Sequence, residues 1–142
     1  LIRASALAFS VVSVDVDEID RYNIFHATML GMQRALAALS LSPAYALVDG
    51  NHLPRPMPCR ARAVVDGDAR EPSISAASII AKTVRDGIMC ELDRVHPGYG
   101  FARHKGYSTP EHLAALDLYG PCRHHRMDFA PCAEALARQQ VA

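Results

Sequence analysis

The sequence predicts an α/β fold, in which short buried strands alternate with amphipathic helices. Two apolar runs carry this prediction: residues 45–48, which end in Asp49-Gly50-Asn51, and residues 61–65, which end in Asp66-Gly67-Asp68. Short apolar runs bounded by Gly and Asp are typical of buried strands. The third observation is a long helical pattern over residues 75–94, directly after the second run.

The composition fits one globular domain over residues 1–142. Half of the residues are hydrophobic and 21% are charged, so the chain can bury a core and is not disordered. No apolar run approaches the ~20 residues of a membrane span, and we expect no membrane partner. The chain opens on Leu1 and enters a strand-like pattern almost at once, so we expect that the N-terminus of the natural protein lies upstream.

The cysteine spacing and the charge distribution indicate the redox compartment and the class of substrate. The four cysteines form no C-x-x-C pair, which favours reduced thiols in a cytoplasmic protein. The net charge is zero, but basic residues gather locally around the second run and in two later segments. Such clusters beside an acidic site fit a polyanionic substrate, and ordinary solvated arginines are the alternative for each cluster. The clusters are Arg55, Arg60, Arg62 and Arg70; Arg103-His104-Lys105; and Arg123-His124-His125-Arg126.

The first half of the chain is expected to begin with a strand and a helix. Residues 6–16 are rich in β-branched residues and predict a strand. Acidic residues follow, which favour a helix start, and small residues then recur at helical spacing through Leu39. Residues 40–43 break this helix. Three prolines within residues 54–58 predict a stiff loop between the two apolar runs.

The helix over residues 75–94 is the longest expected element. Its first half is small or apolar almost all round, so we expect that end to be buried, with a core stripe of Ala77, Ala81, Val84, Ile88 and Leu92. Hydroxyl and basic side chains follow an adjoining face at three- and four-residue spacing, where they could contact phosphate. These residues are Ser75, Ser78, Lys82 and Arg85. The alternative for Ser75 is a role as the helix N-cap, and the alternative for Ser78 is packing as a small residue.

The last part of the chain predicts a loop and two helices. Residues 96–110 mix glycines with aromatic and basic residues, a composition suited to nucleic-acid contact. For Tyr99 and Phe101 we favour packing against the edge of the core instead. Thr109 and Pro110 predict the cap and first turn of a helix that ends near Tyr119, and residues 130–138 predict a short final helix.

Asp49 and Asp68 are the candidate catalytic and metal-binding residues. Each follows a predicted buried strand, and carboxylates at a sheet edge are how proteins hold hard divalent cations such as Mg²⁺. Without further motifs, a turn-forming Asp-Gly after a strand explains Asp49 equally well.

The motifs together resemble bacterial ribonuclease HII, the type 2 ribonuclease H, and cover nearly the whole chain in the family's order. The most specific is Ser-x-x-Ser-Ile-x-Ala-Lys, a short step after Gly67-Asp68. The matching stretches are Glu18-Ile19-Asp20, Asn23-Ile24, Ala27-Thr28-Met29-Leu30, Val48-Asp49-Gly50-Asn51, Gly67-Asp68, Ser75-Ala76-Ala77-Ser78-Ile79-Ile80-Ala81-Lys82, Arg85-Asp86, Tyr99-Gly100-Phe101, His104-Lys105-Gly106-Tyr107, Gly120 and His124-His125-Arg126.

The resemblance implies a ribonuclease H-like mixed sheet of about five strands flanked by helices. It also implies an endoribonuclease that degrades the RNA strand of RNA–DNA hybrids and incises 5′ to single ribonucleotides in duplex DNA. Family enzymes place Mg²⁺ or Mn²⁺ on four acidic residues, of which Asp49 and Asp68 match two. The other two belong to a D-E-x-G-R-G motif that this sequence lacks, so the chain looks like a C-terminal part of the domain with its first strands missing. We expect this chain alone to be inactive.

The mechanism that the resemblance implies is two-metal hydrolysis, which leaves 3′-hydroxyl and 5′-phosphate ends. Lys82 and Arg85 are candidates for positioning phosphate, with Ser78 and Lys105 as further substrate contacts. Tyr107 matches the family's aromatic residue that stacks at the ribose–deoxyribose junction. The expected partners are RNA–DNA hybrid and ribonucleotide-containing duplex DNA, bound by a monomer.

Two other classes of function stay open at this stage. A degenerate domain of this fold could grip hybrids without cutting them, with a salt dependence set by the basic clusters. A small-molecule α/β enzyme could use Asp49 and Asp68 on a phosphorylated metabolite, but the chain has no Gly-rich phosphate loop. The residues upstream of Leu1 discriminate: an Asp-Glu followed by Gly-Arg-Gly supports the nuclease. The roles of Asp86, His104, His124 and His125 are open.

Overall fold

The computed structural model describes residues 1–141, with side chains through residue 140. The chain divides into two compact units. The first unit contains residues 1–15 and 24–82, and the second contains residues 16–23 and 83 onward. The boundary therefore crosses two helices, α2 (Val16–Ala37) and α4 (Pro72–Val95). A single domain over residues 1–142 remains a prediction.

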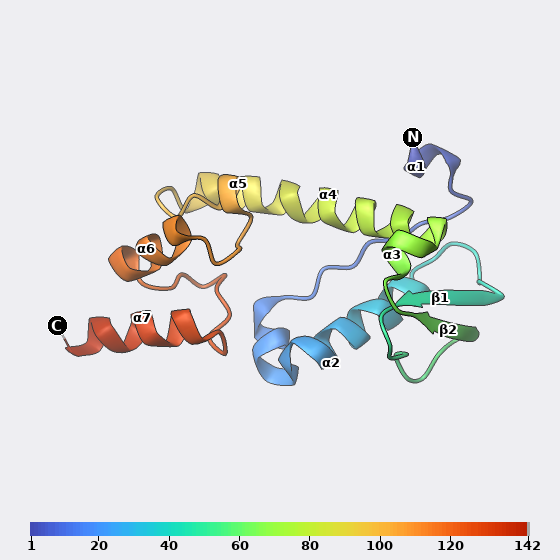
Figure 1. The fold of residues 1–142 in the computed structure, drawn as a ribbon, viewed down its shortest axis with the longest axis horizontal. Helices are drawn as coiled ribbons and strands as arrows, with labels where there is room; N and C mark the ends of the chain where they lie inside the picture. The colour runs from blue at the N-terminus through green and yellow to red at the C-terminus, as the bar shows by residue number, and fades with distance from the viewer. Residues whose placement is uncertain (142) are drawn as a thin grey trace. The chain divides into compact units, whose positions relative to one another are not determined.

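The first unit is built on a parallel pair of strands, β1 (Tyr45–Asp49) and β2 (Arg60–Val64), which lie side by side in Figure 1. Asp49 pairs with Val64 at the carboxyl end of both strands. Along β1, Ala46 and Val48 are buried, and their neighbours are more exposed. The two predicted strands are confirmed to within one residue at each end, and so is the proline-rich loop between them. Within the described chain the sheet has these two strands.

The strand predicted for residues 6–16 is wrong. A short helix, α1 (Ile2–Ser5), precedes an irregular segment, and α2 begins at Val16. The β-branched composition alone does not make a strand, because a strand needs a partner for its backbone hydrogen bonds, and β1 and β2 pair only with each other in the described chain. Leu7 is 93% exposed in this segment.

The helix predicted through Leu39 is confirmed as α2, with one interruption. Asn23 has φ 64° and ψ 165°, which breaks the helical path after its second turn. Ala27 follows the break and is buried in the first unit. The interruption also coincides with the boundary between the two units.

The long helix α4 is confirmed, but its predicted burial is not. It begins at Pro72, so Ser75 lies inside the helix and is not its cap. Ile74 is buried, yet Ala77 and Ala81 are exposed and the side chain of Ile79 is half-exposed. Periodicity predicts which face of a helix can be buried, and burial itself depends on an element that covers the face. The described residues leave the first half of α4 largely uncovered.

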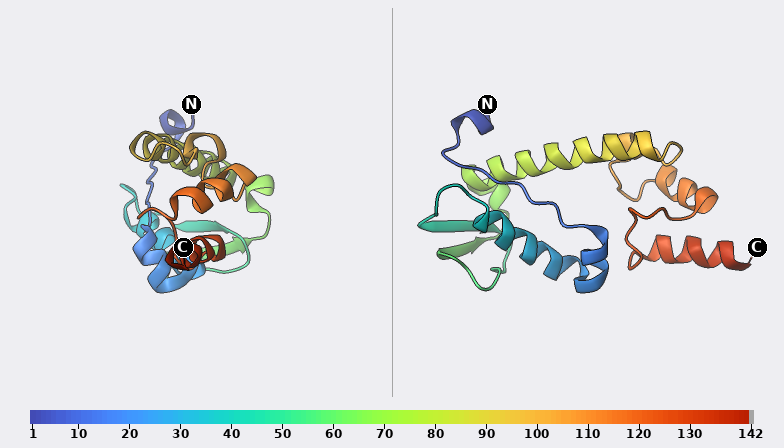
Figure 2. Two further views of the ribbon diagram at one scale, coloured as in Figure 1. Left: turned by 90° about the vertical axis from the view of Figure 1, so that its left-hand side faces the viewer. Right: turned by 180° about the vertical axis from the view of Figure 1, so that it is seen from behind.

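The second unit has its own hydrophobic core. It forms where α5 (Phe101–His104), α6 (Pro110–Tyr119) and α7 (Ala130–Val141) meet, and the views in Figure 2 place α6 beside α7. The prediction that Tyr99 and Phe101 pack into the core is confirmed, because both rings are buried and stack with centroids 5.1 Å apart. The buried members are Tyr99, Phe101, Ala115, Leu116, Cys132 and Ala135.

The capping residues in the sequence predicted the start of α6 correctly. The Thr109 hydroxyl accepts a hydrogen bond from the His112 amide at 3.3 Å, and Pro110 occupies the first turn. The helix ends at Tyr119, and the following Gly120 has a φ of 72°, which requires the conformational freedom of glycine. The final helix α7 is confirmed and extends three residues past the predicted end. Among the described residues, we find no helix with the length and apolar character that a membrane span requires.

Candidate functional site

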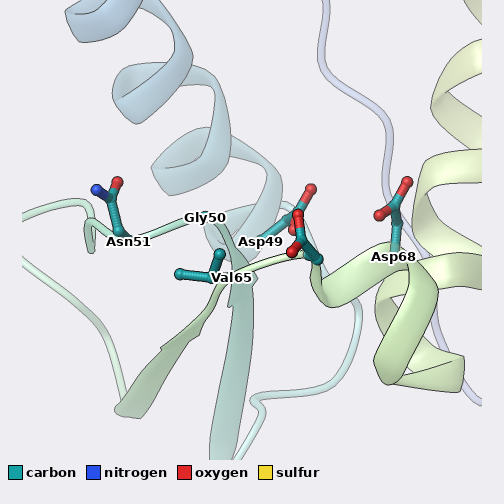
Figure 3. A pocket seen from close by; sticks show the side chains of 6 residues that line it. Asp49, Gly50, Asn51, Val65 and Asp68 are labelled. Carbon is teal, nitrogen blue, oxygen red and sulfur yellow. The ribbon is translucent and has the colours of Figure 1, made fainter.

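A pocket of about 290 Å³ lies at the carboxyl ends of β1 and β2. Both predicted catalytic residues line it: Asp49 ends β1, and Asp68 lies on α3 (Gly67–Arg70), the helical turn that follows β2. In Figure 3 the carboxyl groups of Asp49 and Asp68 both rise on the same side of the ribbon. The pocket is lined by Asp49, Gly50, Asn51, Val65, Asp66 and Asp68.

The connection between β2 and α3 holds Asp49 in place. The Gly67 amide donates a hydrogen bond to Oδ1 of Asp49 at 2.8 Å. A Cβ on Gly67 would lie 2.6 Å from Cδ1 of Ile74 and 3.1 Å from Oδ1 of Asp49, so a side chain there would crowd both. Asp66 takes up a left-handed conformation, with φ 55°, to turn the chain into α3. This turn brings Asp68 to the rim that Asp49 occupies.

The chemistry of the pocket suits a hard divalent cation. Its polar side chains are carboxylates and an amide, which are the oxygen ligands that Mg²⁺ and Mn²⁺ prefer. One oxygen of Asp49 accepts from Gly67, which leaves the other oxygen available. In the part of the chain that the structure describes, no group of three or more His, Cys, Asp or Glu side chains is arranged to hold a metal ion. The donor set fits such a cation in kind and supplies part of its coordination shell.

The pocket contains a carboxylate that the sequence argument gave little weight. Asp66 stands next to Gly67 and lines the same pocket as Asp49 and Asp68. The signal was visible in the Asp-Gly-Asp spacing, which puts two carboxylates around one tight turn. Asn51 lines the pocket too, and its side chain contacts His52.

The candidate substrate residues of α4 fall in both units. Ser78 and Lys82 lie one turn apart in the first unit, which also contains the pocket, but they are not among its lining residues as described. Arg85 is less than a turn further along and belongs to the second unit. The spacing predicted for this face is retained because α4 is a continuous helix through all three.

Two contacts in the second unit involve the other candidate substrate residues. The Arg85 guanidinium lies over the Tyr107 ring, 4.8 Å from its centroid, a cation–π geometry. The Tyr107 side chain is nevertheless 64% exposed, so one face of the ring remains available. The Lys105 ammonium donates to Sγ of Cys90 at 3.1 Å. The structure thus brings Arg85 and Tyr107 together and places Lys105 against α4.

The predicted basic clusters are less cationic than the sequence indicates. Arg62 pairs with Glu71, Arg103 with Glu111, and Arg126 with Asp128. Hydrogen bonds from the Arg126 and Arg103 guanidinium groups lower the pKa of Asp128 and Glu111, respectively. His104 and His125 belong to the same clusters in sequence but are buried, 6% and 7% exposed. Three arginines of these clusters therefore have an acidic partner, and two of their histidines are buried.

Sequence reasoning missed a buried group of histidines in the second unit, consisting of His104, His112 and His125. The rings of His104 and His112 stack with centroids 4.3 Å apart, and Nε2 of His112 lies 3.2 Å from Nε2 of His125. A possible signal was the density of histidines between residues 104 and 125, next to the aromatic residues of the core. Periodicity gives no reason to place them together, because they come from three different segments.

The architecture is that of a type 2 ribonuclease H. It superposes on the crystal structure of the ribonuclease H2 from Pyrococcus horikoshii OT3 with a TM-score of 0.75, over 90% of this chain and 68% of that chain, at 21% identity. A family model described as Ribonuclease HII matches residues 1–132. The chain belongs to the ribonuclease HII family.

Curated relatives named Ribonuclease HII match this chain closely. The protein from Xanthomonas campestris pv. campestris (strain 8004) is 54% identical over 131 residues, which cover 92% of this chain and 55% of the relative. The protein from Burkholderia mallei (strain SAVP1) is 56% identical over 132 residues, which cover 93% of this chain and 61% of the relative. The chain therefore spans little more than half the length of these relatives.

Proposed function

We propose that the full-length protein containing this chain is an endoribonuclease. It degrades the RNA strand of RNA–DNA hybrids and incises 5′ to single ribonucleotides in duplex DNA, leaving 3′-hydroxyl and 5′-phosphate ends. The observation that carries the proposal is that Asp49 and Asp68, from separate elements, line one pocket in a chain of the ribonuclease HII family. The protein acts as a cytoplasmic monomer in the repair of ribonucleotides in DNA.

Asp49 and Asp68 are the proposed ligands of Mg²⁺ or Mn²⁺ and the proposed catalytic residues. These carboxylates would hold the cation, which would supply activation of water and neutralisation of charge on the leaving oxygen. The Gly67 amide restrains the Asp49 carboxylate through its hydrogen bond to Oδ1. Asp66 is a further oxygen donor within reach of the same pocket.

The remaining proposed roles concern substrate binding. Ser78 and Lys82 of the first unit contact phosphate of a bound strand, and Arg85 of the second unit is a separate phosphate contact. Tyr107 presents a half-exposed ring on which a sugar or base can stack, and Arg85 supports the other side of that ring. Lys105 lies two residues before Tyr107 and contributes positive charge near the same loop. The 2′-hydroxyl is the feature that distinguishes RNA from DNA at one nucleotide.

A second function is favoured for the 142-residue chain by itself. Asp49, Asp66 and Asp68 line one pocket, but among the described residues no three potential ligands are arranged to hold a metal ion, so this chain supplies too few ligands for two ions. We propose that the isolated chain is a catalytically inactive fragment that binds hybrids. Its binding then depends on salt through the cationic side chains and not on a divalent metal.

A cleavage assay tests both statements together. Labelled RNA–DNA hybrid and duplex DNA with a single embedded ribonucleotide are incubated with the full-length protein or with the 142-residue chain. The full-length protein is expected to cut both substrates in Mg²⁺ or Mn²⁺ and neither in excess chelator. The 142-residue chain is expected to retard the hybrid in a gel at low salt and cut neither. Failure of the full-length protein to cut would contradict the nuclease, and normal turnover by the chain alone would contradict the inactive fragment.

A further inference from the structure

Two imidazoles form hydrogen bonds with the backbone of the loop that carries Lys105 and Tyr107. Nδ1 of His104 accepts a hydrogen bond from the Gly106 amide at 3.1 Å, and the Tyr107 amide donates to the carbonyl of His104 at 2.9 Å. Nδ1 of His112 lies 3.0 Å from the carbonyl of Tyr107. The backbone of Tyr107 is therefore fixed on both sides, although its ring is exposed.

The backbone partners define the tautomer of each imidazole. A carbonyl can only accept, so His112 carries its proton on Nδ1, and His104 carries its proton on Nε2, which donates to the Tyr99 carbonyl at 2.7 Å. Nδ1 of His125 accepts from the Cys122 amide at 2.9 Å, a shorter contact than those to Cys122 Sγ at 3.1 Å and to the Cys122 carbonyl at 3.3 Å. His125 then donates from Nε2 to the unprotonated Nε2 of His112, 3.2 Å away.

These assignments are mutually consistent only when all three rings are neutral. A second proton on His112 would place an N–H against the N–H of His125, and a second proton on His125 would do so against the Cys122 amide. Burial disfavours the charged forms as well: it lowers the pKa of His112, and burial together with His112 lowers the pKa of His125 to about 4. The group is 3% to 7% exposed, so water does not replace these hydrogen bonds.

We propose that His104, His112 and His125 form a chain of neutral imidazoles that positions the loop at residues 105–107 and so orients the Tyr107 ring for substrate. The inference rests on the proposed function, in which Tyr107 stacks on the nucleic acid. His104 and His112 are positioning residues: they contact the loop backbone and not the substrate. His125 acts one step further away, because it fixes the tautomer with which His112 donates to Tyr107.

A matched pair of substitutions at His112 separates positioning from simple packing. In His112→Asn, the amide nitrogen replaces Nδ1 and can still donate to the Tyr107 carbonyl, whereas the bond to His125 is lost. In His112→Gln, the side chain reaches the position of Nε2 and can still accept from His125, whereas the bond to Tyr107 is lost. Both variants replace a buried ring by a polar amide, so their thermal midpoints should fall by similar amounts.

The two variants are compared in the full-length protein on a duplex with one embedded ribonucleotide. We expect His112→Gln to raise KM by about tenfold with little change in kcat, the effect of losing one hydrogen bond that places a binding residue. His112→Asn is expected to stay within about threefold of the parent. In a Tyr107→Ala background the same His112→Gln change should not raise KM further, because the two residues act through one contact. Equal KM values for the two variants, or additive effects with Tyr107→Ala, would overturn the proposal.

Long-range ¹⁵N–¹H spectra of the histidine rings in the unsubstituted full-length protein give a second, activity-independent readout. We expect His112 as the Nδ1–H tautomer, and His104 and His125 as Nε2–H tautomers, at neutral pH. Any other tautomer of His112 would refute the imidazole chain even if the protein cleaves hybrids normally. The expected tautomers in a protein that cleaves no hybrid would instead refute the proposed function and leave the arrangement of the imidazoles intact.

Discussion

Replacing Asp49 by Asn in the full-length protein is expected to reduce cleavage of RNA–DNA hybrid by about 10³-fold or more, with little loss of hybrid binding. Asn keeps an Oδ1 that can accept from the Gly67 amide, so the turn between β2 and α3 should stay intact. It lacks the negative charge that a divalent cation requires, and metal-ion stabilisation of phosphoryl transfer is worth several kcal/mol, about 1.4 kcal/mol for each tenfold in rate. Single-turnover cleavage and gel retardation measure the two quantities separately.

Asp117→Asn is the matched control for this substitution. Asp117 lies on α6 in the second unit and forms an exposed ion pair with Arg138, and such surface pairs contribute ~0–1 kcal/mol. Its replacement should leave cleavage within about twofold of the parent protein. Unchanged cleavage by the Asp49→Asn variant would remove Asp49 from the site. An equal loss by both variants would show that charge removal anywhere impairs the protein.

Acid is expected to destabilise the second unit well before its carboxylates are protonated. The pKa of His125 is lowered to about 4 by burial first and by His112 second, and burial also lowers the pKa of His112. In the unfolded chain an unperturbed histidine titrates near ~6.5. Stability is therefore complete above about pH 6.5 and decreases as the pH falls towards about 4, because only the unfolded state takes up the proton in that window.

Among the groups around His125, His112, His124 and His96 lower its pKa, and only the backbone hydrogen bond with Cys122 raises it. They come from the loop after α4, from α5, from α6 and from the segment before α7. The loss at pH 4 should be on the order of 2 kcal/mol for this residue. The neighbouring groups are His96, Tyr99, Phe101, His112, Cys122 and His124.

Urea unfolding of the full-length protein between pH 4 and pH 7, followed by tyrosine fluorescence, measures this dependence. Tyr99 is buried in the second core and contacts His125, so its emission reports on this unit. His125→Gln should flatten the dependence of stability on pH, whereas replacement of the exposed His52 by Gln should leave it unchanged. The same slope in the His125→Gln variant and the parent would contradict the assignment of this titration to His125.

Much of the fold follows from local signals in the sequence. Both strands, the proline-rich loop, α2, α4, α6 and α7 were predicted, because alternation, helical spacing, the Thr109 cap and Gly120 each act within a few residues. The segment over residues 6–16 was predicted wrongly, since β-propensity describes a residue's fit to a sheet and does not supply the partner strand. The burial predicted for the first half of α4 is wrong for the same reason. Apolar side chains make a helix face suitable for burial, but they do not supply another element that packs on it.

The candidate site likewise contains residues that the sequence predicts and residues that it does not. Asp49 and Asp68 were found because each follows a recognisable strand, and the parallel pairing of β1 and β2 explains why strand ends so distant in sequence meet at one edge. The contribution of Asp66 depends on a left-handed turn that no pattern specifies. The histidine group depends on three segments that converge in the second unit. The sequence shows that these residues exist but not that their imidazoles form hydrogen bonds with one another.

The central claim is that Asp49 and Asp68 hold the same divalent cation. An anomalous difference map from crystals of the full-length protein soaked in Mn²⁺ tests it most directly. We expect a peak within coordination distance of carboxyl oxygens of both Asp49 and Asp68. A map in which Mn²⁺ binds Asp49 with Asp66 but not Asp68, or in which neither carboxylate touches a peak at saturating Mn²⁺, would contradict the account.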